Sequence, residues 1–77
     1  MDVRTATKYF VNGEVQATDE HKLTVRRILE NAAFTPAEQY ELIRDEGHHT
    51  YRNLDEEVPL HKGERFTAKF TGVTPVS

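Results

Sequence analysis

The stretch Tyr9-Phe10-Val11-Asn12-Gly13-Glu14-Val15 decides how the chain begins to fold. An Asn-Gly pair between two short β-prone runs favours a two-residue type I′ turn, because both residues tolerate a positive φ. We therefore predict a β-hairpin over residues 6–18. With Asn-Gly as its loop, the cross-strand pairs are Val11 with Glu14, Phe10 with Val15, Tyr9 with Gln16, and Lys8 with Ala17.

The hairpin has two faces, and strand alternation assigns its side chains to them. Phe10, Val15 and Ala17 share one face, which we interpret as the core face. Lys8 falls on the same face and would have to extend past its edge. Tyr9 and Val11 then point outward on the opposite face, where they are available to a partner.

One amphipathic helix is predicted after the hairpin, over residues 25–33. Apolar side chains recur at positions 25, 28, 29 and 32, with charged side chains on the other side. Thr24 stands directly before them as an N-cap, and Thr35-Pro36 ends the element because the residue before proline disfavours helical ψ. The apolar stripe of this helix needs a sheet face to cover it.

Two further strands are predicted in the second half of the chain, over residues 40–44 and 65–70. In the latter, Phe66, Ala68 and Phe70 alternate with polar residues and are expected to face the core. The segments between the two strands are a polar turn at 45–49, a short strand or irregular stretch at 50–54, and a further short piece at 58–60.

The predicted order of elements indicates an α+β domain: a mixed sheet of four to five strands with one helix across it, which is the β-grasp architecture. The last strand is the most apolar and belongs beside the first, and this pairing is parallel with the helix in the crossover. We expect the domain to span residues 6–71, after an N-terminal extension of 1–5 and before a C-terminal tail of 72–77.

Composition excludes several classes of function. The 77 residues suit a single domain and carry a net charge of −3, so no cationic field supports binding of nucleic acid or an acidic membrane. Cysteine is absent, which removes disulfides, thiolate zinc sites and cysteine nucleophiles. No apolar run approaches the roughly 20 residues that cross a bilayer, so we expect a cytoplasmic protein.

An enzyme is not expected either. Ser77 is the only serine, and no histidine is placed with a carboxylate that would orient it as a base. His48-His49 reads as a solvated turn, because adjacent residues of an extended segment point apart and cannot share a metal ion. Asp55-Glu56-Glu57 lacks the pattern of a calcium loop. We therefore expect no metal and no cofactor in this chain.

Five short motifs follow one another along residues 6–72: Val11-Asn12-Gly13, Arg27-Ile28-Leu29, Tyr40-Glu41-Leu42, Leu54-Asp55-Glu56-Glu57-Val58 and Gly63-Glu64-Arg65-Phe66. In this order and spacing they resemble the bacterial multiubiquitin family of ubiquitin-like domains. The resemblance implies a protein modifier that is activated at its C-terminus by an adenylating enzyme, passed to a conjugating enzyme and joined to protein targets. It also implies a deconjugating peptidase and a link with antiphage defence, with ATP and zinc belonging to these partner enzymes.

Gly72 is the residue at which the resemblance implies conjugation. A peptidase would first have to remove residues 73–77, and the chain carries Thr71-Gly72 where ubiquitin-like modifiers carry Gly-Gly. The alternative is that Gly72 simply ends the last strand.

Leu42-Ile43 lies in the strand after the helix, where one side chain points inward and the other outward. The resemblance implies that Ile43 is the outward member and binds partners. As outward residues of the same sheet, Tyr9 and Val11 are expected to contribute to this partner surface. The alternative for Ile43 is half-burial beneath the loop at 45–54. A small basic cluster of Lys22, Arg26 and Arg27 either docks an acidic partner or only solubilises the helix.

The alternative function for the whole chain is a noncovalent β-grasp adaptor, which needs a docking face but nothing from its C-terminus.

Overall fold

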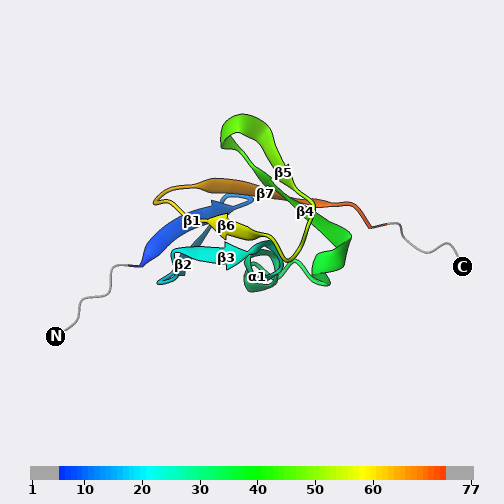
Figure 1. The fold of residues 1–77 in the computed structure, drawn as a ribbon, viewed down its shortest axis with the longest axis horizontal. Coiled ribbons are helices and arrows are strands. Elements are labelled where there is room, and N and C mark those ends of the chain that lie inside the picture. The colour runs from blue at the N-terminus through cyan, green and yellow to red at the C-terminus, as the bar shows by residue number, and fades with distance from the viewer. Residues whose placement is uncertain (1–5, 73–77) are drawn as a thin grey trace, which may run out of the picture.

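Ten short elements follow one another along residues 6–72, the part of the chain that the computed structural model describes (Figure 1). In chain order they are β1 Thr7–Val11, β2 Glu14–Thr18, β3 Lys22–Thr24, α1 Val25–Asn31, the 3-10 turn η1 Ala37–Gln39, β4 Tyr40–Arg44, the 3-10 turn η2 Glu46–His48, β5 His49–Tyr51, β6 Glu57–Pro59 and β7 Arg65–Phe70.

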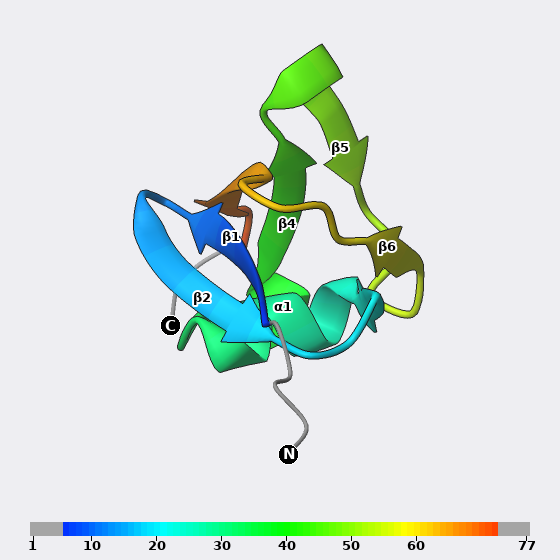
Figure 2. The same ribbon diagram turned by 90° about the vertical axis from the view of Figure 1, so that its left-hand side faces the viewer.

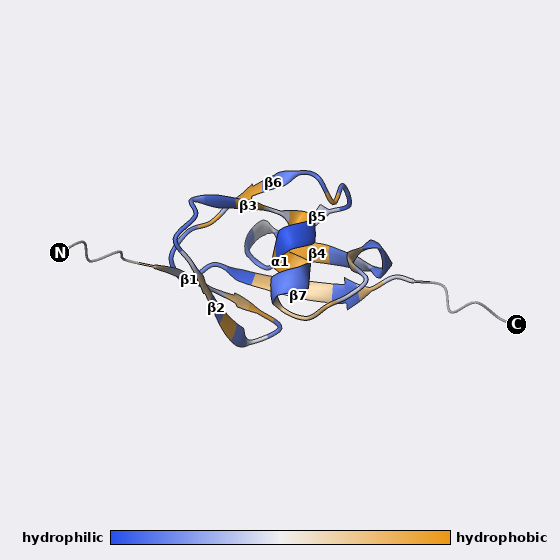
Figure 3. Cartoon of the chain, turned by 90° about the horizontal axis from the view of Figure 1, so that it is seen from below, coloured by the Kyte–Doolittle hydropathy of each residue, from blue (hydrophilic) through white to orange (hydrophobic). Residues whose placement is uncertain are grey.

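The main sheet has five strands in the order β2-β1-β7-β4-β5. β7 pairs in parallel with β1 and antiparallel with β4, so the last strand occupies the middle of a mixed sheet. α1 lies across one face of this sheet, and Figure 3 shows it in front of β4 and β7. The predicted α+β, β-grasp-like architecture and the parallel placement of the last strand beside the first are confirmed.

The hairpin forms in the predicted register, with Val11 opposite Glu14 and Lys8 opposite Ala17. Asn12 and Gly13 adopt φ values of 53° and 83°, as a type I′ turn requires. The short loop therefore fixes which residues face each other across the two strands.

The prediction of which hairpin face is buried is wrong. Tyr9 is 1% exposed and Val11 is fully buried, whereas Val15 is 56% exposed. The parallel pairing with β7 sets Val11 beside Phe66, whose ring meets the edge of Tyr9 at a centroid distance of 6.1 Å. The two segments that make this contact are far apart in the sequence, so the hairpin alone could not reveal which of its faces is buried.

The helix begins as predicted and ends earlier. The backbone N–H of Arg27 donates to the Thr24 side-chain oxygen over 3.2 Å, which confirms the N-cap. At the other end, Ala33 takes a φ of 68° and the N–H of Phe34 donates to the Leu29 carbonyl over 2.9 Å. This Schellman motif stops α1 at Asn31, before proline can act.

A second, two-stranded sheet was not predicted. β3 pairs antiparallel with β6, so that Leu23 faces Val58, and an ion pair of 2.9 Å joins Lys22 to Glu57. Three-residue strands are too short to show an alternating pattern in the sequence. The small sheet covers the end of the core that holds the start of α1.

Phe66 and Ala68 face the core as predicted, but Phe70 does not belong to it. Phe66 is 1% exposed and Phe70 is 50% exposed, although both lie on the same side of β7. Phe70 pairs with Tyr40, the first residue of β4, at the end of the sheet beyond the core. Its ring packs edge-on against that of Tyr40, 5.4 Å away, which in turn contacts Phe34.

No helix within residues 6–72 has the length and apolar character needed to span a membrane.

Candidate functional site

The sheet face turned away from α1, which we call the outer face, carries the side chains that alternate with the core. Three of them are large and apolar, namely Phe10 on β1, Val15 on β2 and Ile43 on β4, and Ala17 of β2 adds a small apolar side chain. Strand pairing sets Val15 beside Phe10 and Phe10 beside Arg65 of β7. The outer face therefore presents a row that runs from the sheet edge toward the central strand.

Arg65 of β7 lies at the inner end of the row formed by Val15 and Phe10. Its guanidinium carbon stands 5.3 Å from the centre of the Phe10 ring, within cation–π range. Phe10 is consequently half-buried, while Val15 remains open to solvent on the edge strand. The row thus offers a partner an apolar surface with a cationic group at its inner end.

Ile43 occupies the neighbouring part of the outer face, between Thr67 of β7 and Thr50 of β5. It is half-buried, and Leu42 beside it is fully buried against the core. Figure 2 shows the β4–β5 hairpin standing clear of the rest of the sheet beyond this point. Ile43 is accordingly the outward member of its pair; its role in binding stays a prediction.

Tyr9 and Val11 cannot belong to this surface. Both are core residues, and burial raises the pKa of the Tyr9 phenol above its usual value while a hydrogen bond with Asn31 opposes the shift. Phe10 and Val15 take their place on the outer face. The sequence did hold a signal for this exchange, because an exposed Lys8 on the Phe10 side indicates that this side meets solvent.

Exchanging the two neighbouring apolar residues of β4 for aspartate tests this assignment. We expect Ile43→Asp to fold with a modest loss of stability, because its carboxylate can reach solvent. The matched variant Leu42→Asp places a charge in the core and is expected to abolish the thermal transition. Circular dichroism melts of both variants give the comparison. An Ile43→Asp chain that unfolds like Leu42→Asp would place Ile43 in the core.

The C-terminal end of β7 carries the second candidate feature. The N–H groups of Thr71 and Gly72 both donate to the carbonyl oxygen of Gln39, over 2.7 and 3.0 Å. Gln39 is the last residue of η1, directly before β4, and two consecutive N–H groups that share one carbonyl across a strand pair give the arrangement of a β-bulge, which ends the pairing. Gly72 is therefore docked against the segment that precedes β4.

A glycine is needed for this close approach. A Cβ atom on Gly72 would stand 2.9 Å from the Cβ and Cγ atoms of Gln39 and 3.0 Å from the ring of Phe70. Contacts this short require the Gln39 side chain or the backbone at residue 72 to shift. The tail at residues 73–77, which the modifier hypothesis requires to be trimmed, lies outside the described residues.

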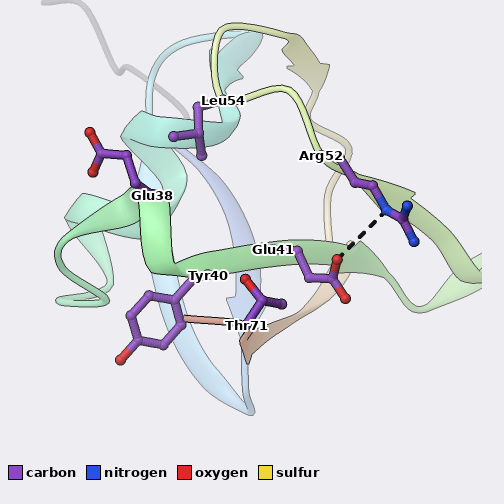
Figure 4. Close-up of a pocket in the computed structure, with 6 residues that line it drawn as sticks. All are labelled: Glu38, Tyr40, Glu41, Arg52, Leu54 and Thr71. Atoms are coloured by element: carbon purple, nitrogen blue, oxygen red, sulfur yellow. Dashed lines mark ion pairs between the residues drawn. The ribbon is translucent and has the colours of Figure 1, made fainter. Parts of the chain in front are cut away.

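A shallow groove of about 510 Å³ lies close to Gly72. Figure 4 shows the six side chains that line it, namely Glu38, Tyr40, Glu41, Arg52, Leu54 and Thr71. Glu41 and Arg52 approach to 3.8 Å across it. The lining mixes three charged side chains with apolar surface from Tyr40 and Leu54, and it contains no histidine.

The basic cluster around the start of α1 is largely neutralised by acidic neighbours. Arg26 contacts Glu38 at 3.1 Å and Asp55 at 3.6 Å. A hydrogen bond from its own backbone N–H and the guanidinium of Arg26 lower the pKa of Glu38. These contacts tie α1 to η1 and to the loop before β6, which is a structural role.

The histidines are not gathered at any site, and the described part of the chain holds no group of three His, Cys, Asp or Glu residues that could bind a metal ion.

The structure also reveals a polar contact that the sequence did not indicate. β1 ends at Val11, and beyond this point the side chain of Asn12 continues the hydrogen bonding to β7. Its carbonyl oxygen accepts from the N–H of Ala68 over 2.9 Å, and its amide donates to the Ala68 carbonyl over 3.3 Å. Turn chemistry already accounts for an Asn-Gly pair, so nothing in the sequence pointed to this second role.

A scan against protein-family models, a search of curated proteins and a search of solved structures each found no match to this chain.

Proposed function

We propose that this chain is a bacterial ubiquitin-like protein modifier that is activated and conjugated through Gly72. One observation carries the proposal: β7 is the middle strand of the sheet, and Gly72 lies two residues after the end of this strand. A fold alone does not define a function. What supports the proposal is a glycine two residues after the central strand of a β-grasp-like sheet.

The chemistry proposed for Gly72 has three steps. A peptidase hydrolyses the bond between Gly72 and Val73, consuming one water molecule and freeing the Gly72 carboxylate. An adenylating enzyme joins this carboxylate to the AMP part of ATP, with pyrophosphate as the leaving group. Transfer to a conjugating enzyme and then to a target amine releases AMP and forms an amide bond. Because the adenylation step consumes ATP, we place the reaction in the cytoplasm. We further propose that it belongs to a system of antiphage defence.

The proposed partner surface for these enzymes and for downstream readers is the outer face, with Phe10, Val15 and Ile43 as its apolar contacts. What supports this partner surface is that Val15 is exposed and that Phe10 and Ile43 are only half-buried. Nucleic acid and membrane are not proposed as partners.

A second candidate function is a noncovalent adaptor. The observation that favours it is the β-bulge, because both N–H groups of residues 71 and 72 are already bonded to Gln39. An adaptor can keep this contact permanently. A modifier has to release it before an enzyme can bind the C-terminal residues in extended form.

Substitution at Gly72 separates the two functions. In cells that carry the complete conjugation system, we expect mass spectrometry to find target lysines linked to Gly72 of the wild-type chain, and none with Gly72→Glu. His61→Glu, which adds the same charge in the exposed turn between β6 and β7, controls for effects of charge alone and should still yield adducts. Melting curves establish that each variant folds.

Two results would count against the mechanism. Adducts that join targets through Ser77, or that persist in Gly72→Glu, exclude Gly72 as the activated residue. A wild-type chain that forms no adducts in cells where the enzymes are active favours the adaptor.

A further inference from the structure

β2 forms one edge of the five-stranded sheet. Its five residues pair with β1 on one side, and no other strand among residues 6–72 pairs with its second side. An open edge of this kind presents backbone groups in the spacing that another strand needs.

The hairpin geometry identifies the groups that point outward. In a hairpin with a two-residue loop, the pair that flanks the loop exchanges both backbone hydrogen bonds, and bonded pairs then alternate along the ladder. Val11 with Glu14 is the flanking pair, so Tyr9 with Gln16 is bonded too. The N–H and C=O groups of Val15 and Ala17 consequently face the open edge.

β2 also lacks the features that usually protect an edge strand. It contains no lysine, proline or glycine and runs without a bulge through Glu14–Thr18. Val15 is 56% exposed, and Ala17 is exposed on the same outer face. The five residues of β2 therefore offer an incoming strand free backbone groups, and Val15 and Ala17 offer it an apolar surface.

The charges around β2 argue against a second copy of the chain as occupant. Antiparallel pairing of two β2 strands centred on Gln16 would set Glu14 opposite Thr18 of the other copy. The acidic residue Glu20, which lies two positions after β2, would then stand close to Glu14 across the junction. Like charges at both ends of the interface oppose such a dimer.

We propose that the open edge of β2 binds an extended strand of a partner protein by β-augmentation. Residues of that strand opposite Val15 and Ala17 are apolar, the residue opposite Gln16 is polar, and a Lys or Arg stands at each end, opposite Glu14 and near Glu20. Backbone hydrogen bonds hold the strand, and the terminal charges set its register. The site is independent of Gly72 and of any conjugation reaction.

A synthetic peptide tests the proposal without a known partner. The probe is acetyl-Lys-Thr-Val-Thr-Val-Lys-amide, which pairs antiparallel with β2 in the register just described. We expect its titration to shift the amide resonances of Val15 and Ala17 and to slow their hydrogen exchange. The peptide with both lysines replaced by glutamate should bind at least about tenfold more weakly, and raising NaCl from about 50 to 500 mM should weaken the lysine peptide.

Two variants locate the binding edge. Ala17→Pro removes an outward N–H without touching the bonds to β1 and should abolish binding, whereas Ala17→Ser keeps this N–H and should bind like the wild type. If Ala17→Pro also lowers the melting temperature, Val15→Lys provides the second variant, since it keeps every N–H and repels the cationic peptide.

Three outcomes would overturn the proposal: resonance shifts centred on Ile43 with β2 unchanged, undiminished binding to Ala17→Pro, or concentration-dependent dimerisation of the free chain through β2. None of them bears on Gly72.

Discussion

Phe66→Ala is expected to lower the free energy of unfolding by about 3–5 kcal/mol, the usual cost of removing a buried aromatic ring. Phe66 is 1% exposed, lies on the central strand and packs against Tyr9. A domain of this size has about 5–15 kcal/mol in total. The variant should therefore lose a large share of its stability, measured by urea unfolding followed by circular dichroism.

Phe70 provides a matched control on the same strand. It is also a phenylalanine and also paired with β4, but half of its surface is exposed and its main contact is the ring of Tyr40. Phe70→Ala should cost only about 1 kcal/mol, the scale of one aromatic pair. If Phe66→Ala is too unstable to fold, Phe66→Leu should still unfold at lower urea than the wild type. Equal losses at the two positions would contradict the assigned core.

Asn12→Ala is expected to destabilise the chain by about 2–3 kcal/mol, which is unusual for an exposed turn residue. Two effects add. Alanine tolerates the φ of 53° less well than asparagine, and the N–H of Ala68, now bonded to the Asn12 side chain over 2.9 Å, loses its partner. Chemical unfolding measures the sum of the two effects.

Asn12→Gly separates these effects. Glycine accepts the positive φ but makes no side-chain hydrogen bond, so this variant should lose about 1–2 kcal/mol from the missing contact alone. Amide exchange at Ala68 should accelerate in both variants. An Asn12→Gly chain as stable as the wild type would show that the contact with β7 contributes nothing.

Local chemistry made much of the fold predictable. Asn12-Gly13 admits one tight turn, and that turn sets the register of the hairpin without reference to the rest of the chain. Thr24 and the apolar residues after it define the start of the helix in the same way. The alternation around Phe66 marks a buried strand, and its apolar character places it in the middle of the sheet.

Contacts between distant segments decided the rest. The contact between Val11 and Phe66 decides which side of the hairpin is buried. In the hairpin considered alone, the side that carries Phe10 could equally well face the core. Phe70 continues the alternating pattern of the core residues, but it lies past the end of the core, where β7 pairs with the first residue of β4. For the candidate site, alternation predicted that Leu42 and Ile43 point to opposite faces, and the family resemblance selected Ile43 as the outward one. The bulge at Gly72, in contrast, depends on Gln39, which is far away in sequence.

The parallel pairing of β1 with β7 also governs how this domain can be connected to others. Neighbouring strands that run in the same direction bring the chain into the sheet at one end and out at the opposite end (Figure 1). Because the end of β1 pairs with the start of β7, the first residue of β1 and the last residue of β7 lie about eight residue steps apart along the sheet, roughly 26 Å. A segment attached before β1 and a segment attached after β7 therefore start from opposite ends of the sheet.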